Sequence, residues 1–185
     1  MAHVFTPEGI RNCAHAGVAS VEHGTFMTEA SAEMMRQQGM YLVPTLSVVR
    51  MISQRVEEGK LPDFVAEKLP LVRDSAPEAV RIALEAGVAI ASGSDVYGPG
   101  APNRGWEIEL KAEIIGPMAA IISATRTNAQ ILGMQDHLGT IEAGKIADLI
   151  AISGDPLEDV ALLKDATNVK MVIQAGRVVK DANGA

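Results

Sequence analysis

The sequence predicts an α/β fold in which short parallel strands alternate with helices. Three times a helical pattern closes on a glycine, at Gly17, Gly39 and Gly87, and a short apolar run follows at once. Glycine suits the left-handed position just after a helix, and the length and branching of these runs favour strands. Strands that alternate with helices pair in parallel, with the helices packed outside the sheet.

The same signals predict the order of the elements. Expected strands span 18–21, 40–43 and 88–91, directly after the three glycines. Helix starts are expected where a cap residue or a first-turn proline precedes apolar residues at helical spacing, at Thr6-Pro7, Thr28-Glu29 and Ala76-Pro77. After the last strand, the spacing predicts one helix from Trp106 to Ile115 and another from Pro117 to Leu132.

The last part of the chain has a different pattern. From about Leu138 onward the apolar runs are short and are separated by turn residues. Two of these runs flank Ala175-Gly176-Arg177, an arrangement typical of a β-hairpin. We therefore expect a barrel-like α/β part over residues 1–137 and a small β module over residues 138–185.

Composition excludes several classes of function. With 185 residues, 48% of them hydrophobic, and a formal charge of −7, the chain has enough apolar material for a core. The acidic balance, and the lack of a Lys/Arg cluster beside aromatic residues, argue against nucleic acid as a partner. No apolar stretch is long enough to span a bilayer, and no basic-then-apolar signal segment stands at Met1. A cytoplasmic protein without membrane contact is expected.

Three strand ends carry side chains of the kind that bind metal ions. The runs at 1–3 and 18–23 end in His3 and His23, and the run at 88–95 ends in Asp95. Parallel strands bring their carboxyl ends to one rim, which is where a (β/α) barrel builds its active site. Neutral imidazoles and a carboxylate are good ligands for Zn²⁺ and similar divalent ions. The pattern predicts that these three side chains converge on a metal.

Each of these residues also has an ordinary structural interpretation. His3 stands near a terminus, where a solvent-exposed histidine is common, and Asp95 is a suitable residue for a helix cap or a turn. Glu22 should point away from His23 if the strand stays regular. Arg104 follows the Asp95 segment, where it either shapes a substrate pocket or packs on the surface.

Several motifs, taken in order, carry a family resemblance that covers nearly the whole chain. They are Ala2-His3-Val4-Phe5-Thr6-Pro7, Ser20-Val21-Glu22-His23-Gly24-Thr25, Val43-Pro44-Thr45, Ser92-Gly93-Ser94-Asp95, Ala124-Thr125 with Asn128-Ala129, and the stretch from Leu138-Gly139-Thr140 to Ala147-Asp148-Leu149. Their order and spacing resemble the metal-dependent amidohydrolase superfamily. Within it, the chain is most similar to the imidazolonepropionase-like enzymes that include Xaa-Pro dipeptidases, or prolidases.

The resemblance implies a TIM-type (β/α)8 barrel with a metal centre at its C-terminal rim, together with a β-sandwich. His3 matches the metal histidine of the family's fifth strand, His23 that of the sixth, and Asp95 the aspartate of the eighth. The aspartate resembles both a metal ligand and the proton acceptor for the attacking water. The chain is therefore expected to form strands five to eight of the barrel and part of the sandwich, which is the C-terminal half of such an enzyme.

Other features of the family have no counterpart in these 185 residues. The first-strand His-x-His pair and the fourth-strand lysine that bridges two metals are absent. Phe5 stands where relatives commonly have tyrosine, at a position that contacts substrate. Phe5 and Arg104 are therefore the candidate substrate-binding residues.

The resemblance implies a metal-dependent hydrolase of carbon–nitrogen bonds in small amides, dipeptides or N-acyl amino acids. Its cofactor is expected to be one or two divalent ions, with zinc as the first choice. The alternative is a truncated, non-catalytic fragment that folds or self-associates without a complete metal site. Four barrel strands alone would leave two unpaired edges, so a homo-oligomer is also expected.

Overall fold

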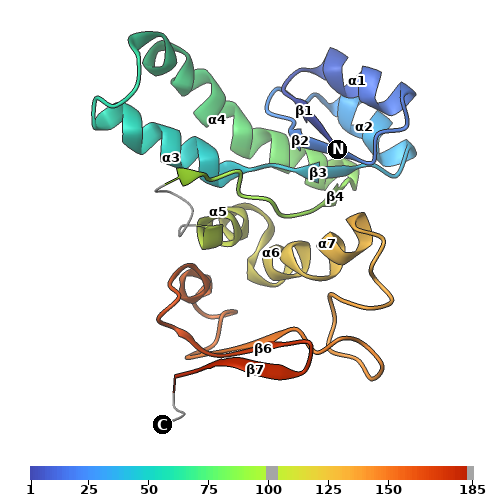
Figure 1. Ribbon diagram of the computed structural model, residues 1–185. Coiled ribbons are helices and arrows are strands. Elements are labelled where there is room, and N and C mark those ends of the chain that lie inside the picture. Colours follow the sequence, from blue (N-terminus) through green and yellow to red (C-terminus); the bar gives the residue numbers. More distant parts are fainter. Residues whose placement is uncertain (99–103, 183–185) are drawn as a thin grey trace.

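The computed structural model describes residues 1–98 and 104–182. Figure 1 shows a parallel sheet with its helices in one half of the molecule and an antiparallel sheet in the other. The elements, in chain order, are β1 Ala2–Val4, α1 Pro7–His15, β2 Ser20–His23, α2 Glu29–Gln37, β3 Tyr41–Val43, α3 Leu46–Glu57, α4 Asp63–Ala86, β4 Ala89–Ile90, α5 Trp106–Ile115, α6 Pro117–Ala124, α7 Arg126–Ile131, β5 Leu149–Ile152, the 3₁₀ helix η2 Val160–Lys164, β6 Val169–Gln174 and β7 Arg177–Asp181.

The parallel sheet has four short strands in the order β1-β2-β3-β4. One row across the sheet pairs Ala2 with Val21, Val21 with Leu42, and Leu42 with Ile90. Helices connect each strand to the next, so the predicted alternation of strands and helices is confirmed (Figure 1). All four carboxyl ends consequently lie at the same edge of the sheet.

Two of the predicted helix starts are confirmed at the level of hydrogen bonds. Helix α1 begins at Pro7, and the Thr6 hydroxyl accepts a hydrogen bond from the backbone N–H of Gly9 at 3.2 Å. Helix α2 begins at Glu29, where Thr28 and Ser31 cap each other's backbone N–H groups. These caps satisfy amides that the first helical turn leaves without partners.

The predicted helix start at Ala76-Pro77 is wrong. Helix α4 runs without interruption over Asp63–Ala86 and contains Pro70 and Pro77. An internal proline costs a helix about 3 kcal/mol because it removes one hydrogen bond and its ring crowds the preceding turn. The face formed by Ala76, Val80 and Ala83 is buried in the core, and the burial of this face offsets that cost.

The helix predicted from Pro117 to Leu132 is divided at Thr125, where φ is −120° and ψ is −88°. The hydroxyl of Thr125 donates a hydrogen bond to the carbonyl of Ile121 at 2.8 Å. A threonine that bonds to the carbonyl four residues earlier competes with the helical pattern and bends the chain. The result is two short helices, α6 and α7, with different axes (Figure 1).

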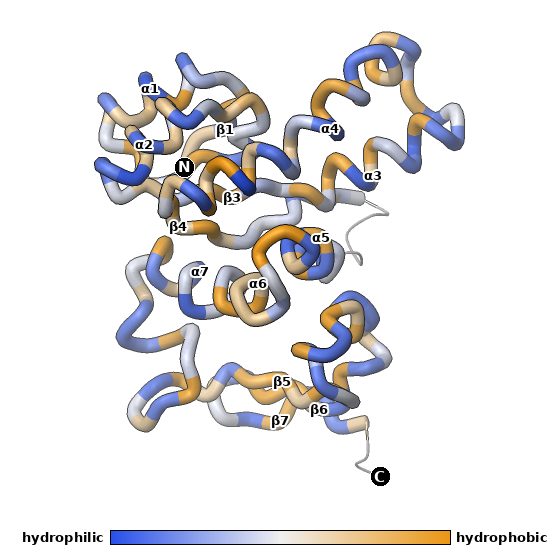
Figure 2. The backbone as a smooth tube through the Cα atoms, turned by 180° about the vertical axis from the view of Figure 1, so that it is seen from behind, coloured by the Kyte–Doolittle hydropathy of each residue, from blue (hydrophilic) through white to orange (hydrophobic). Residues whose placement is uncertain are grey.

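The main core lies between the parallel sheet and the helices that cover it. Its fully buried side chains come from α1, β2, α2, β3 and α4, namely Ile10, Val21, Met35, Leu42 and Val80. Hydrophobic residues also run along α5 and α6, which lie between the two sheets (Figure 2). No helix within the described ranges is both long enough and apolar enough to cross a membrane.

The C-terminal strands form an antiparallel sheet in the order β5-β6-β7. The predicted hairpin is present, because β6 and β7 pair around Ala175 and Gly176, which have φ values of 49° and 78°. Positive φ at both central residues is what a tight hairpin turn requires. An ion pair from Lys164 to Glu109, at 2.6 Å, ties this half of the molecule to α5.

Candidate active site

Strained backbone conformations gather at the carboxyl ends of the parallel strands. His23 at the end of β2 has a φ of 75°, Thr45 beyond β3 has 53°, and Asp95 beyond β4 has 51°. Left-handed backbone costs a residue other than glycine about 1–3 kcal/mol, and a β-branched residue such as threonine adopts it least readily. Among the described residues, the one other case is Ala175 in the hairpin turn. This strain therefore marks one rim of the sheet.

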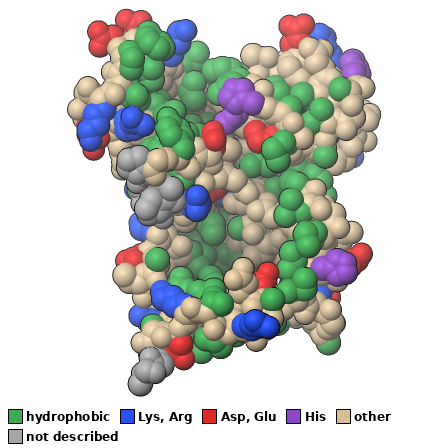
Figure 3. All heavy atoms as spheres, in the orientation of Figure 1, with side chains coloured by type: hydrophobic (Ala, Val, Ile, Leu, Met, Phe, Trp, Pro, Cys, Tyr) green, Lys and Arg blue, Asp and Glu red, His purple; other side chains and the backbone are tan. Residues whose placement is uncertain are grey.

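The structure brings the three predicted metal ligands together at that rim. Nδ1 of His3 lies 2.8 Å from Nε2 of His23, and the same Nε2 lies 4.0 Å from a carboxylate oxygen of Asp95. His23 is buried, whereas His3 and Asp95 are exposed. Figure 3 shows histidine and acidic side chains beside one another on this face. The expected convergence of three strand ends is thus present in the fold.

Thr45 has a role that the sequence did not indicate. Its hydroxyl lies 2.6 Å from Nδ1 of His23. When Nδ1–H donates to this hydroxyl, Nε2 carries the lone pair that points toward His3 and Asp95. Two signals were available: Thr45 is a polar residue that follows an apolar strand after Pro44, and Val43-Pro44-Thr45 is one of the motifs that carry the family resemblance.

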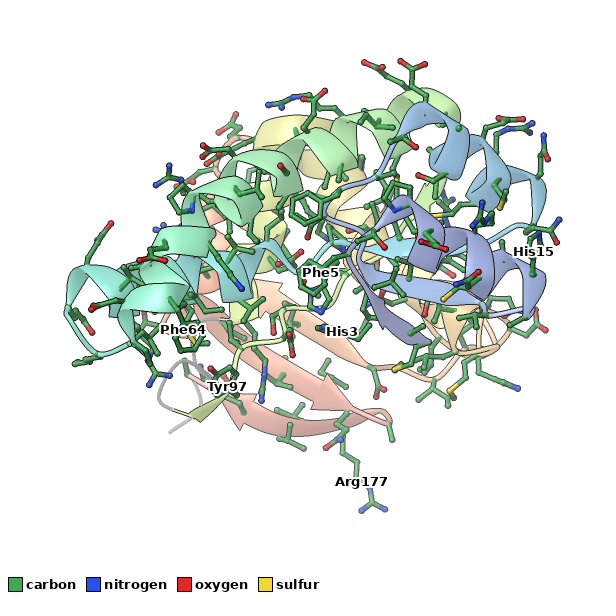
Figure 4. All side chains as sticks on the ribbon, turned by 90° about the horizontal axis from the view of Figure 1, so that it is seen from above. His3, Phe5, His15, Phe64, Tyr97 and Arg177 are labelled. Carbon is green, nitrogen blue, oxygen red and sulfur yellow. The ribbon has the colours of Figure 1, made fainter. Side chains whose placement is uncertain are left out.

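The two candidate substrate-binding residues lie outside the cavity wall. The ring of Phe5 stacks on His23 with 4.9 Å between centroids and meets His3 edge-on at the same distance. Figure 4 shows Phe5 beside His3 near the centre of the molecule. Arg104 is exposed just before α5. Neither is among the described residues that line the cavity, and the contacts of Phe5 are with the two imidazole rings.

A cavity of about 440 Å³ opens over these side chains. His3, His23 and Asp95 lie on its wall, and Val43, Ile131 and Leu132 supply apolar surface. A pocket with apolar walls and a few convergent polar groups is the usual form of a small-molecule site. The volume is appropriate for a substrate of a few residues or smaller.

Glu22 also lines this cavity, contrary to the expectation that it would point away from His23. The left-handed φ of His23 breaks the regular alternation of the strand, so neighbouring side chains face the same space. The carboxylate of Glu22 accepts hydrogen bonds from the backbone N–H of Ala2 at 2.7 Å and from the Ser20 hydroxyl at 2.8 Å. Its contacts are structural, because they tie β1 to β2.

The electrostatic environment keeps His23 neutral. Burial lowers the pKa of His23, the neighbouring His3 lowers it further, and the Asp95 carboxylate opposes the shift with the smallest effect. A neutral imidazole retains a lone pair on one ring nitrogen. At pH 7 this side chain is therefore in the form that binds a cation or accepts a proton.

The chemistry of this donor set fits a divalent cation. As the side chains stand, the described ranges contain no group of three or more His, Cys, Asp or Glu residues arranged around a common ion. The nitrogens of His3 and His23 are 2.8 Å apart, as in a hydrogen bond, whereas two ligands of a tetrahedral zinc ion are separated by about 3.3 Å. A small change in the relative position of the two rings would open this distance to the one that a shared divalent ion requires.

Comparison with known proteins relates nearly the whole chain to one protein family. The family model described as the Amidohydrolase family matches residues 1–179. Ochratoxinase from Aspergillus niger is 34% identical over 182 residues, which are 97% of this chain and 37% of that protein. The chain thus spans well under half the length of this relative.

Solved structures resemble the fold closely. A prolidase complexed with N-methylphosphonate-L-proline is 35% identical, with a TM-score of 0.92, and the match covers 98% of this chain and 45% of that one. A Xaa-Pro dipeptidase with methionine bound in its active site is 37% identical, with a TM-score of 0.86 over 96% of this chain and 44% of that one. The structure of Aspergillus niger ochratoxinase is 30% identical, with a TM-score of 0.85, and the match covers 100% of this chain and 42% of that one.

Proposed function

Because the chain belongs to the amidohydrolase family, we propose that its rim residues form part of a metal-dependent site that hydrolyses carbon–nitrogen bonds. The observation that carries the proposal is the convergence of His3 in β1, His23 at the end of β2 and Asp95 beyond β4 at one edge of the sheet. The proposed substrates are small amides, dipeptides and N-acyl amino acids. Two of the similar structures are described as a prolidase and a Xaa-Pro dipeptidase, which supports the choice of dipeptides.

The proposal includes an assignment of the fold. We assign β1 to β4 to strands five to eight of the family's barrel, and the antiparallel β5-β6-β7 sheet to part of its β-sandwich. Two features support this assignment. The four strands are parallel and pair in chain order, and a potential metal-binding side chain lies within β1, at the end of β2 and beyond β4. The rim position of the cavity agrees with the place where such barrels hold substrate.

His3, His23 and Asp95 would hold the divalent ion, with zinc as the first choice. When bound at such a site, the ion acidifies a water molecule and polarises the substrate carbonyl. Thr45 fixes the ring of His23 through the 2.6 Å contact at Nδ1, which leaves Nε2 facing the site. Phe5 packs against both imidazoles, stacked on His23 and edge-on to His3.

Asp95 is the proposed proton carrier. Its side chain is 56% exposed at the mouth of the cavity, where it reaches both solvent and a bound substrate. The carboxylate takes the proton of the attacking water and returns it to the leaving nitrogen, so the amine departs neutral. The apolar wall formed by Val43, Ile131 and Leu132 holds the non-polar part of the substrate.

Substitution of Asp95 tests the hydrolase proposal. Asp95→Asn preserves size and removes the basic oxygen, so turnover of dipeptides and N-acyl amino acids in the presence of Zn²⁺ should fall about 10²-fold or more in any active form of the protein. His137→Ala, which changes an exposed residue away from the cavity, is the control that should retain turnover. An Asp95→Asn protein that works normally contradicts the proposal.

A second candidate is a segment that folds and holds a cation weakly without turnover of its own. It is favoured by the share of the relatives that the chain spans, 37% of ochratoxinase and 45% of the prolidase. Three ligands without further support would hold a loosely positioned ion. Zn²⁺ binding by the 185-residue chain without hydrolysis of any dipeptide in the panel would favour this candidate over the first.

A further inference from the structure

Helix α5 carries two charged side chains that are fully buried and that the proposed reaction does not use. Glu107 is 1% exposed and Lys111 is 0% exposed, and they lie one helical turn apart. Burying a charged pair is costly, and well-packed apolar residues in its place are often as stable or more so. The reason for the pair is therefore sought in the contacts that its two side chains make.

Glu107 contacts the segment that carries Thr45. One of its carboxylate oxygens accepts hydrogen bonds from the backbone N–H of Ser47 at 2.8 Å and from the Ser47 hydroxyl at 2.9 Å. Ser47 is the second residue of α3, and Thr45, at the start of this helix, makes no side-chain cap. Glu107 thus replaces the missing cap from a distant helix, and its negative charge suits the helix N-terminus.

Lys111 contacts the segment that carries Asp95. Its ammonium group donates hydrogen bonds to the carbonyl of Ala91 at 3.0 Å and to the Ser123 hydroxyl at 2.6 Å. The next residue, Ser92, is held on both its N–H and its carbonyl by the side chain of Asn128, each at 2.9 Å. The chain is therefore fixed at two consecutive residues just before it turns to Asp95.

We infer that Glu107 and Lys111 are positioning residues for this rim of the sheet. Glu107 positions the segment of Thr45, which contacts His23, and Lys111 positions the segment that leads to Asp95. The two residues lie on one helix and contact the segments that follow β3 and β4, so they tie these two segments to each other. The inference rests on the proposed function for its catalytic meaning, but the placement of His23 is a property of the metal-free protein.

Glu107 is the better residue to change, because Gln provides a matched control. Glu107→Ala removes the acceptor for both Ser47 hydrogen bonds, whereas Glu107→Gln keeps an acceptor oxygen of the same size and reach. Val80→Ala in α4 serves as the stability control. Val80 is fully buried in the main core, and its side chain has no group that could hydrogen-bond to Glu107, Lys111 or their partners. Removing methyl groups there destabilises the protein without touching the pair.

The first measurement is the ¹⁵N spectrum of the histidine rings in the metal-free protein. We expect the wild-type protein, Glu107→Gln and Val80→Ala to show one His23 tautomer, with the proton on Nδ1. Glu107→Ala should show a mixture of tautomers, because Thr45 is no longer held against Nδ1. A Glu107→Ala spectrum identical to that of the wild-type protein, or a Val80→Ala spectrum that changes as much, would overturn the inference.

The second measurement is Zn²⁺ affinity by competition with a chelator. Glu107→Ala should bind about tenfold more weakly or worse, the scale expected when a group that orients a ligand is lost, and Glu107→Gln should stay within about threefold of the wild-type protein. If Glu107→Ala does not fold, Ser47→Ala removes the hydroxyl contact alone and should bind Zn²⁺ more weakly than Glu107→Gln does; binding equal to that of Glu107→Gln would then count against the inference. A wild-type chain that binds no Zn²⁺ defeats the proposed function, while the ¹⁵N spectrum still decides the positioning role.

Discussion

Thr45 combines a strained backbone with the hydrogen bond that orients the site histidine. Its φ of 53° is unfavourable for a β-branched residue, yet this conformation brings the hydroxyl to within 2.6 Å of Nδ1 of His23. Both residues are buried, so a lost partner is not replaced by bulk water. The strain at Thr45 is therefore offset by a contact that matters to the neighbouring side chain.

Thr45→Val should separate the hydroxyl from the backbone strain, because valine keeps the shape and loses the hydrogen bond. We expect Zn²⁺ affinity to fall about tenfold, and stability to fall by about 1–3 kcal/mol because Nδ1 of His23 is left buried without a partner. Thr45→Ser is the control and should retain most of the affinity. Zn²⁺ titration and urea unfolding measure the two effects, and a Thr45→Val protein with wild-type affinity would show that the contact is incidental.

Sequence reasoning identified the site residues that depend on topology and missed those that depend on single dihedral angles. The gathering of His3, His23 and Asp95 was predictable, because parallel strands share a rim, although His3 lies within β1 and Asp95 lies beyond the end of β4. Thr45 and Glu22 were not assigned, because their places depend on the left-handed φ at Thr45 and His23. A local pattern does not show such a conformation when the residue is not glycine.

Helices show the same division between local and distant causes. Caps are local, and so α1 and α2 begin where their threonines predict. The continuity of α4 through Pro77 depends on burial against strands far away in the sequence, and the prediction there was wrong. The contacts of Glu107 and Lys111 likewise join α5 to segments that lie 60 and 20 residues away.

The buried pair on α5 gives stability a specific dependence on pH. Burial lowers the pKa of Lys111 to about 8, with Glu107 opposing the shift, and burial raises the pKa of Glu107, with Lys111 and the Ser47 hydrogen bonds opposing it. Between pH 8 and the ordinary lysine value of 10.5, the folded protein thus binds fewer protons at Lys111 than the unfolded chain does. The contribution of Lys111 to the free energy of unfolding therefore rises with pH across that window.

Comparison with Lys111→Met isolates this effect from the rest of the titration. The free energy of unfolding of the wild-type protein, minus that of the variant, should increase from pH 8 to pH 10.5, by up to about 3 kcal/mol. Methionine has a similar length and does not titrate, so surface groups cancel in the difference. Urea unfolding at several pH values measures it, and a difference that stays flat or falls across the window would contradict the assigned charge state.

At the scale of the whole molecule, the parallel sheet has two outer strands, β1 and β4, each paired with one neighbour in the described part of the chain. The backbone beyond β4 is partly covered, because the Asn128 side chain bonds to Ser92 on both sides. The outer edge of β1 is the more open of the two, and exposed edges recruit further strands. We therefore propose self-association through this edge.

Sedimentation velocity over a range of protein concentrations tests the association. We expect the mass of the 185-residue chain to increase with concentration. A wild-type chain that stays monomeric at every concentration would rule out the proposed edge contact.

The four histidines of the chain allow a direct test of the shared cation site. Ring nitrogens of His3 and His23 lie 2.8 Å apart at the rim. His15 ends α1 at the periphery of the molecule (Figure 4). His137 is exposed and is not among the residues that line the cavity. The measurement is a Co²⁺ titration of the chain, followed by visible absorption, for the wild-type protein and for alanine at each histidine. His3→Ala and His23→Ala should each weaken binding at least tenfold, while His15→Ala and His137→Ala leave it unchanged. Equal losses for all four variants, or a loss confined to His15 or His137, would contradict the account.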